Sequence, residues 1–555
     1  MSHVITQPCC NDGGCVAACP VNCIHPTPDE PGFATAEMLY VDPDTCIDCG
    51  ACVPECPVDA IVPDDALTVT ETVFLDINAA YYRDHDVRDG LVPFRPYRPA
   101  GVSAPIRVAV VGSGPAGLYT AKELLTESNV HVDVLDRLPT PLGLIRSGVA
   151  PDHGATKRVG ETLEEVAASP RFRYLLGVEV GPHVTAAALA DAYSAVVYAH
   201  GASAPKSLGI EGEALAGSIS STEFVAWYNG HPDYAHRRFD LSGERVVVVG
   251  NGNVALDVAR ILLSDPDVLA RTDIADHALE ALRERSVREV VLLGRRGPAD
   301  AAFTIGELAG LADLSGVDVV VDDPAPDSDR LGSLDDVTAA KVELLHDFAA
   351  RTARPENRRL VFRFHTRITE MLGDDRGRVR TLRVTVGGAP DELDTSLVVR
   401  SIGYAGEPLD GLPFDDAGGT VPNREGRVVD PATGEVIPGK YVAGWIKRGS
   451  RGGIGANRRC GEETARAVLD DAAVGVLAPR ATDPDIATDA VRRGATVVDG
   501  AAWKRIDAAE RAAGRRAGRP RVKLTDLDAL IGAAGRSPGG DPVGALSYPD
   551  NKERT

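Results

Sequence analysis

The sequence predicts an α/β protein of several domains, and three observations support this prediction. Short apolar strand patterns lead directly into glycine-rich turns of the type Gly-x-Gly-x-x-Gly/Ala at two places, residues 112–117 and 250–255. Nine of the ten cysteines lie within the first 56 residues. The chain has 555 residues, more than one hydrophobic core usually supports. We therefore expect two Rossmann-like dinucleotide-binding domains preceded by a small α+β domain that holds the cysteines.

Charge is distributed unevenly along the chain. The net charge of −22 argues against a nucleic-acid or membrane partner, and no apolar run approaches the ~20 residues of a membrane span. Residues 1–4 lack a signal region, so we expect a cytoplasmic location. Residues 1–70 hold eleven acidic residues and no Lys or Arg. Basic residues cluster elsewhere, at Arg146, Lys157, Arg158, Lys447, Arg448, Arg451, Arg458 and Arg459. This distribution indicates either two ordinary solvated surfaces or docking of an acidic carrier on a basic face.

Two cysteine runs of the same spacing define the N-terminal domain. The spacing Cys-x2-Cys-x2-Cys-x3-Cys-Pro occurs at Cys46, Cys49, Cys52 and Cys56. An earlier run has one substitution, at Cys9, Asp12, Cys15 and Cys19. The pattern resembles the bacterial dicluster ferredoxins, in which the fourth cysteine of each run crosses to the other iron–sulfur cluster. The resemblance implies a [4Fe–4S] cluster on Cys46, Cys49, Cys52 and Cys19, and another cluster on Cys9, Cys15 and Cys56. Structural zinc is the alternative, but its sites usually pair separate Cys-x2-Cys units or include His.

Asp12 stands where the first cluster would have a fourth cysteine ligand. A carboxylate is a harder and more weakly held ligand for iron than a thiolate. The first cluster is therefore either [3Fe–4S] or an Asp-ligated [4Fe–4S], and we favour [3Fe–4S]. Cys10 and Cys23 have no place in either ligand set, and we expect both to be buried free thiols.

The first dinucleotide fold begins with the strand pattern 107–111 and the turn that contains Gly112, Gly114 and Gly117. A helix pattern follows, and a second strand, 130–135, ends on Asp136. The glycines let the backbone approach a pyrophosphate at the helix N-terminus, and an acid at this distance binds ribose hydroxyls. Strand, helix and acid in this order make the dinucleotide interpretation specific.

Residues 141–153, Pro-Leu-Gly-Leu-Ile-Arg-Ser-Gly-Val-Ala-Pro-Asp-His, closely resemble the adrenodoxin reductase-like family of ferredoxin–NADP reductases. The resemblance continues through 178–181 and 221–230 and resumes at 444–449 and 452–454. It implies one FAD domain formed by 105–240 and 401–534, with an NADPH domain, 241–400, inserted between them. By position, the flavin contacts would be Ala116, Asp136, Leu144, Val180, Trp445, Gly452, Gly453 and Ile454. The alternative for Trp445 is an ordinary core aromatic residue.

The second dinucleotide fold follows the strand pattern 245–249. Its turn predicts nucleotide contacts at Asn251, Gly252, Asn253 and Val254. The next strand, 289–293, follows a helical insertion around 274–284 and leads to Arg295 and Arg296 rather than to an acid. A bidentate arginine suits a 2′-phosphate, so these residues favour NADPH over NADH. The alternative is two arginines on a solvated loop.

Residues 303–308 also resemble the reductase family, in which a glutamate at the position of Glu307 lies near the nicotinamide. With His153, Glu307 is our candidate for an active-site polar pair that positions the cofactor or relays a proton. Hydride transfer itself needs no side-chain nucleophile, because the flavin carries the chemistry. A surface histidine and a helix-dipole glutamate are the alternatives.

Together these features predict a ferredoxin–NADP reductase fused to its own ferredoxin. It would exchange electrons between NADPH, FAD, two clusters and an external redox protein, such as a ferredoxin, a monooxygenase or another reductase. We expect the ferredoxin domain over 1–70, a proline-interrupted linker over 71–104 with a short turn at 79–82, and a disordered tail over 535–555. The electron-input subunit of a larger reductase or synthase is one alternative, and a redox-sensing nucleotide-binding module is another.

Overall fold

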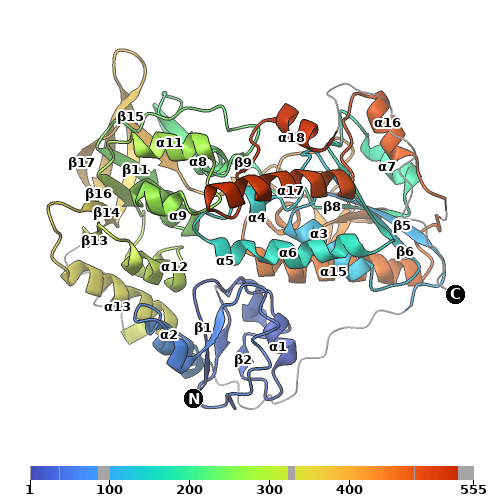
Figure 1. Ribbon diagram of the computed structural model, residues 1–555, viewed down its shortest axis with the longest axis horizontal. Coiled ribbons are helices and arrows are strands. Elements are labelled where there is room, and N and C mark those ends of the chain that lie inside the picture. The colour runs from blue at the N-terminus through green and yellow to red at the C-terminus, as the bar shows by residue number, and fades with distance from the viewer. Residues whose placement is uncertain (1, 37, 86–100, 323–331, 481, 536–555) are drawn as a thin grey trace.

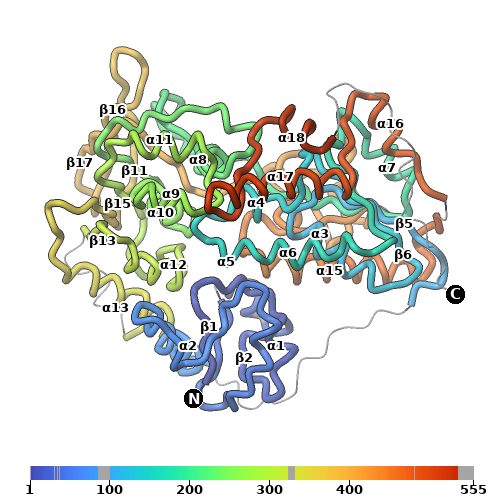
Figure 2. Tube along the Cα trace, in the orientation of Figure 1, coloured from blue at the N-terminus to red at the C-terminus, as the bar shows by residue number. Residues whose placement is uncertain are grey.

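The computed structural model describes residues 2–36, 38–85, 101–322, 332–480 and 482–535. Two large sheets with their helices form the upper part of the molecule in Figure 1, and the N-terminal domain lies beneath both. The chain trace in Figure 2 shows the same arrangement, with α2 running beside α13. Among the described residues, no helix combines the length and the apolar character needed to span a bilayer.

A seven-stranded sheet forms the core of the first dinucleotide fold, in the order β20-β21-β22-β8-β5-β6-β7. Its strands are β5 (Ile106–Val111), β6 (Val130–Asp136), β7 (Phe172–Leu176), β8 (Ala195–Tyr198), β20 (Asn423–Arg424), β21 (Arg427–Val429) and β22 (Val436–Val442). The central strands are parallel and buried on both faces, which explains their continuous apolar sequences. Because β22 pairs in parallel with β8, the chain returns to this sheet after the second dinucleotide fold.

The inserted part contains a six-stranded parallel sheet in the order β10-β18-β11-β12-β14-β13. Its strands are β10 (Ser218–Ser220), β11 (Arg245–Val249), β12 (Glu289–Leu293), β13 (Val317–Val321), β14 (Arg358–Arg363) and β18 (Leu397–Arg400). A three-stranded antiparallel sheet adjoins it, formed by β15 (Thr366–Gly373), β16 (Val379–Val386) and β17 (Ala389–Asp394). Where the chain leaves and re-enters the first fold, β9 (Ala204–Pro205) pairs with β19 (Tyr404–Ala405).

Helices cover both sheets. Those that position the candidate site are α3 (Pro115–Leu124), α4 (Leu144–Ser147), α5 (Gly154–Lys157), α9 (Asn253–Leu263), α12 (Ile305–Gly310), α14 (Trp445–Arg448) and α15 (Ile454–Ala473). The others are α6 (Val159–Glu164), α7 (Ala186–Ala192), α8 (Ser221–Tyr228), α10 (Pro266–Leu269), α11 (Asp276–Arg283), α13 (Asp336–Ala350), α16 (Ile486–Arg492), α17 (Gly500–Ala517) and α18 (Leu527–Ala533).

The N-terminal domain consists of two short antiparallel pairs and helices. β1 (His3–Ile5) pairs with β4 (Ile61–Pro63), β2 (Ile24–His25) pairs with β3 (Tyr40–Val41), and α1 (Gly14–Ala18) lies within the first cysteine run. The pairing of β1 with β4 joins the beginning and the end of this small domain.

The expected start of the linker, at residue 71, is wrong, because a helix of the N-terminal domain follows it. Residues Val73–Asp84 form helix α2, whose buried Phe74 and Ile77 belong to the same apolar core as the cysteines. The buried amide of Asn78 accepts hydrogen bonds from the backbone N–H groups of Ile5 (3.2 Å) and Val41 (2.9 Å). The apolar spacing of three and four residues was the signal for this helix. The remainder of the linker at 86–100 and the expected tail from 536 onward lie outside the described residues.

Candidate functional site

The first glycine-rich turn has room for a nucleotide. Gly117 packs α3 tightly on β5, because a Cβ atom there would lie 2.0 Å from the Gly112 carbonyl oxygen. A Cβ atom on Gly114 would meet nothing within 4 Å, so space remains open at the N-terminus of α3. Asp136 at the end of β6 accepts hydrogen bonds from the Ser113 backbone N–H (2.8 Å) and hydroxyl (2.6 Å). This arrangement fits a dinucleotide pyrophosphate and its ribose.

The C-terminal segment brings further predicted flavin contacts to the same turn. Gly444 has a φ of 76°, and a Cβ atom on it would lie 2.6 Å from the Cβ atom of Ala116. Trp445 is half-buried and stacks on Tyr404, with 5.7 Å between the ring centroids. Its Nε1 atom donates a hydrogen bond to the Gly452 carbonyl (3.3 Å). Trp445 therefore lies beside the glycine-rich loop and outside the apolar core.

The other predicted flavin contacts occupy different environments. Gly453 precedes α15 as its N-cap, and Ile454 is the first residue of that helix. Leu144 begins α4 and is 49% exposed, so its side chain is free to contact a ligand. Val180 is buried in the apolar layer on one face of the seven-stranded sheet.

The second glycine-rich turn is built in the same way. A Cβ atom on Gly250 would lie 2.1 Å from a backbone carbonyl oxygen at residue 401, whereas one on Gly252 would meet nothing within 4 Å. Asn253, the first residue of α9, accepts a 2.8 Å hydrogen bond from the backbone N–H of Thr304. Thr304 caps α12, the helix that carries Glu307. The nucleotide turn and Glu307 are thus held together.

Beyond β12 the structure places two guanidinium groups at the surface. Arg295 and Arg296 are exposed, and Arg296 lies 3.5 Å from the carboxylate of Asp300. Asn251 directs its amide toward the backbone at 294, and Val254 is half-buried against the apolar core. An anion approaching this edge of the sheet would meet two positive charges.

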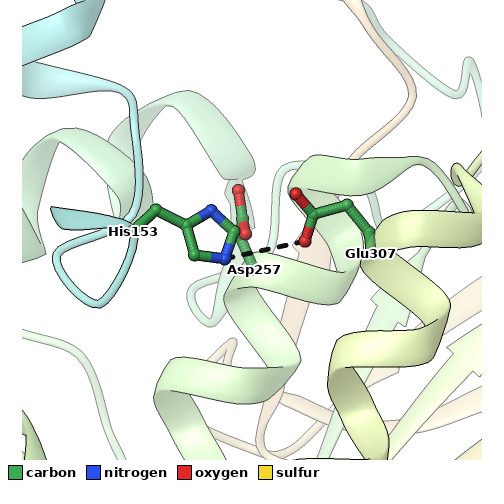
Figure 3. Close-up of side chains that lie close together, drawn as sticks. All are labelled: His153, Asp257 and Glu307. Carbon is green, nitrogen blue, oxygen red and sulfur yellow. Dashed lines mark ion pairs between the residues drawn. The ribbon is translucent and has the colours of Figure 1, made fainter. Parts of the chain in front are cut away.

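His153 and Glu307 lie side by side (Figure 3). The distance from His153 Nε2 to Glu307 Oε2 is 3.7 Å, and the side chains are 15% and 16% exposed. Asp257 of α9 brings a second carboxylate to within 4.8 Å of both. Arg260, on the next turn of α9, pairs with Asp257 (2.6 Å), Asp152 (2.6 Å) and Glu307 (3.5 Å). Asp257 and Arg260 were missed from the sequence, although their spacing of three places them on one helix face.

The environment of Glu307 changes its acidity. Burial raises the pKa of this carboxyl group and Asp257 raises it further, whereas the charges of His153 and Arg260 and a hydrogen bond from Gln7 oppose the rise. A carboxyl group that titrates above its usual range beside an imidazole is suited to proton exchange.

The cysteines of the expected ligand sets lie in two groups, one with Cys9, Cys15 and Cys56 and the other with Cys19, Cys46, Cys49 and Cys52. Cys19, Cys46, Cys49 and Cys52 line one small cavity, which Cys23 also lines. The Sγ atoms of Cys23 and Cys19 are 3.4 Å apart. Cys9 belongs to the other group. Burial raises the pKa of its thiol to about 12, and the charges of Cys56 and Asp12 contribute to this rise. A thiol in this position becomes a thiolate ligand when a bound cation supplies positive charge, which fits iron.

Comparison with known proteins identifies the family of the chain. The model of the pyridine nucleotide-disulphide oxidoreductase family matches residues 106–285, and that of the 4Fe-4S binding domain matches residues 39–62. The chain is 50% identical to a probable ferredoxin/ferredoxin–NADP reductase of Mycobacterium tuberculosis, over 97% of this chain and 96% of that protein. The chain belongs to the ferredoxin/ferredoxin–NADP reductase family.

A relative that matches less of the chain is also informative. NADPH-ferredoxin reductase FprA of Mycobacterium tuberculosis is 47% identical over 77% of this chain and 98% of its own. The structure of FprA in complex with NADPH has a TM-score of 0.72 and 45% identity, covering 78% of this chain and 99% of that one. The present protein is thus an oxidoreductase that joins an iron–sulfur ferredoxin domain to a ferredoxin–NADP reductase and passes electrons between NADPH, FAD and iron–sulfur centres.

In this ferredoxin–NADP reductase the ferredoxin domain contacts the beginning of α15. The backbone N–H of Gly455 donates a 2.8 Å hydrogen bond to the carbonyl of Cys10. A Cβ atom on Gly455 would lie 1.6 Å from the Asn11 carbonyl oxygen, so this close approach requires glycine. Gly455 follows Ile454, a predicted flavin contact, and Cys10 follows Cys9, a predicted cluster ligand. The hydrogen bond therefore joins the segments that carry these two residues.

Asp12 faces the reductase. Its Oδ2 atom accepts a 2.9 Å hydrogen bond from Arg458 Nη1, and the same nitrogen donates to the Asp12 carbonyl (2.9 Å). The Asp12 side chain is 14% exposed, so the guanidinium compensates a largely buried carboxylate. Nothing in the cysteine spacing indicated this partner, which lies far along the chain.

Part of the basic cluster contacts the acidic domain. Besides Arg458, Arg459 pairs with Asp29 (3.4 Å) and Arg158 pairs with Asp59 (2.9 Å). Other members pair inside the reductase: Arg146 with Glu510 (2.5 Å), Lys157 with Asp273 (2.6 Å) and Lys447 with Glu463 (2.8 Å). Three of the clustered arginines therefore contact the ferredoxin domain. Arg146, Lys157 and Lys447 instead form ion pairs within the reductase.

Proposed function

We propose that electrons enter the ferredoxin domain at the ligand set nearest the flavin site and leave it at Cys49. The hydrogen bond between Gly455 and Cys10 carries this proposal, because it links the first turn of α15 to the chain beside Cys9. Cys49 is exposed and belongs to the other ligand set. FAD, when bound, supplies the conversion between hydride transfer and single-electron transfer.

The residues present favour two different clusters. Cys9, Cys15 and Cys56 supply three thiolates, while the carboxylate of Asp12 is engaged by Arg458. We therefore assign a [3Fe–4S] cluster to this set rather than an Asp-ligated [4Fe–4S] cluster. Four of the five cysteines that line one cavity, Cys19, Cys46, Cys49 and Cys52, suit a [4Fe–4S] cluster.

The order of reduction tests this assignment. Oxidised protein is mixed anaerobically with NADPH, frozen after increasing times and followed by paramagnetic resonance. We expect the signal of the oxidised three-iron centre to disappear before any signal of a reduced four-iron centre appears. Reduction of the four-iron centre first would contradict the proposed direction through the ferredoxin domain.

His153 and Glu307 are proposed to act at the reductase site. Arg260 fixes Asp152, Asp257 and Glu307, so the Glu307 carboxylate is held beside the imidazole. The pair would position the nicotinamide and pass a proton between the site and solvent, since both side chains are partly exposed.

Arg295 and Arg296 are proposed to select NADPH. Changing both to glutamine should lower the ratio of kcat/KM for NADPH over NADH by about tenfold or more, because charge-assisted hydrogen bonds to the 2′-phosphate are lost. Steady-state reduction of ferricyanide with each nucleotide measures this ratio. Arg367→Gln, which changes another exposed arginine of the same half, serves as the control. An unchanged preference in the double variant would show that other residues recognise the phosphate.

The external acceptor is proposed to be a redox protein with a basic face. Ile47 and Val53 are exposed around Cys49, and the surrounding residues carry only acidic charges. We further propose a cytoplasmic location and a division into a ferredoxin domain, an FAD domain and an inserted NADPH domain. The insertion begins after β9 rather than at residue 241, because β10 already belongs to the six-stranded sheet. Steady NADPH-driven turnover by the isolated chain would exclude the redox-sensor alternative and disfavour an obligate input subunit.

A further inference from the structure

The ferredoxin domain reaches the polar pair of the reductase through one side chain. Gln7, two residues before Cys9, donates a hydrogen bond from Nε2 to Glu307 Oε1 (3.0 Å). The same nitrogen lies 3.4 Å from His153 Nε2. A Cβ atom on Gly306 would be 3.8 Å from the Gln7 Cα atom, so the backbone at Gln7 lies against the first turn of α12.

We propose that Gln7 is a positioning residue that the ferredoxin domain supplies to the reductase site. It holds the Glu307 carboxylate beside His153 while the two domains are docked, and it leaves when they separate. The proposal rests on the role assigned above to Glu307 and His153, and it deepens that role by making the site depend on the docked domain.

The surroundings of Glu307 explain why an additional donor matters. On α9, Asp257 adds negative charge, and Arg260 divides its donors among three carboxylates. Gln7 is a neutral donor to Oε1 of Glu307, whereas Arg260 contacts Oε2. The two donors therefore engage different oxygens of the carboxylate. A hydrogen bond to the ionised form favours that form, and this contribution opposes the effect of burial on the pKa of Glu307.

The coupling must be reciprocal. If docking favours the Glu307 carboxylate, then protonation of that carboxylate must weaken docking by the same free energy. The fusion would therefore link proton uptake at the reductase site to the position of the electron carrier. Asp152 and His153, in the segment before α5, contact the same group of charged side chains: Asp152 pairs with Arg260, and His153 lies beside Glu307. Both residues therefore belong to this linkage.

The test uses the full-length protein loaded with FAD and clusters. The rate at which NADPH bleaches the flavin is measured by anaerobic stopped flow across a range of pH for Gln7→Leu and Gln7→Met. We expect a loss of about fivefold at about pH 6 and almost none at about pH 9, because the variants favour the protonated carboxyl. Arg158→Gln removes a solvent-exposed ion pair with Asp59, which contributes too little to separate the domains, and should leave the pH profile unchanged.

A double variant distinguishes docking from a local effect. Gly455→Ala should alter the pH profile in the same direction, since separation also removes Gln7, and adding Gln7→Leu to it should change nothing more. Unchanged profiles in both Gln7 variants, or an equal loss at every pH, would overturn the proposal. Glu307→Gln tests the underlying role separately: flavin reduction as fast as in the parent protein at every pH would refute the role of Glu307 itself.

Discussion

Replacing Gly455 with alanine should lower the rate of electron transfer from the reductase to its own clusters by about tenfold or more. The added Cβ atom would lie 1.6 Å from the Asn11 carbonyl oxygen and 2.5 Å from that of Cys10. Both obstacles are backbone atoms, so the strain is relieved chiefly by separating the domains. Stopped-flow absorbance, with flavin and cluster bleaching resolved after mixing with NADPH, measures the rate. Flavin bleaching itself should persist, with the altered pH profile expected from loss of the Gln7 contact.

A second glycine at the interface supplies the matched control. A Cβ atom on Gly306 would meet Gln7 and Phe74 at 3.8 Å, which is ordinary van der Waals contact. Gly306→Ala should therefore keep the parental rate of cluster reduction. Equal rates in the two alanine variants, whether both slow or both fast, would contradict the docking contact at Gly455.

Removing the guanidinium of Arg458 should also slow cluster reduction by about tenfold, because the largely buried Asp12 carboxylate would lose its charge-assisted partner. Arg459→Met is the control, since Arg459 and Asp29 form a more exposed and longer pair whose loss should have little effect. Stopped flow again measures the rate for Arg458→Met and for the control. Similar behaviour of the two variants would remove the special role of the Asp12–Arg458 pair.

Substitution of Asp12 then separates docking from ligation. Asp12→Asn should leave the paramagnetic signal of the three-iron centre intact, because the carboxylate is engaged by the reductase. Asp12→Cys should produce a stable four-iron site. Loss of the first cluster in Asp12→Asn would identify the carboxylate as a ligand, and a three-iron centre that survives in Asp12→Cys would contradict this view of the position.

The architecture could be predicted because its signals are local. The spacing from Cys46 to Cys56 and the turn at Gly112–Gly117 each lie within a few residues, and each chemistry needs that spacing. The return of the chain to the first sheet through β22 could be predicted only from the resemblance at 444–454, because strand pairing across an insertion leaves no periodic pattern.

The contacts between domains could not be predicted in the same way. Charge asymmetry left open whether the acidic domain docks on a basic face, and it did not distinguish Arg458, which contacts Asp12, from Arg146, which is paired internally. Gln7 is uncharged and lies outside every motif, so only the folded structure brings it to Glu307. Helix α2 was missed although its apolar spacing was visible, because the prolines that follow it suggested a linker.

We propose that electrons pass from the reductase to the ferredoxin domain within one chain. The direct measurement is the rate of cluster reduction after anaerobic mixing with excess NADPH, repeated over a wide range of protein concentration. A tethered and docked carrier is reduced at a rate that does not depend on protein concentration. A rate that rises in proportion to protein concentration would show transfer between separate molecules and would contradict the claim.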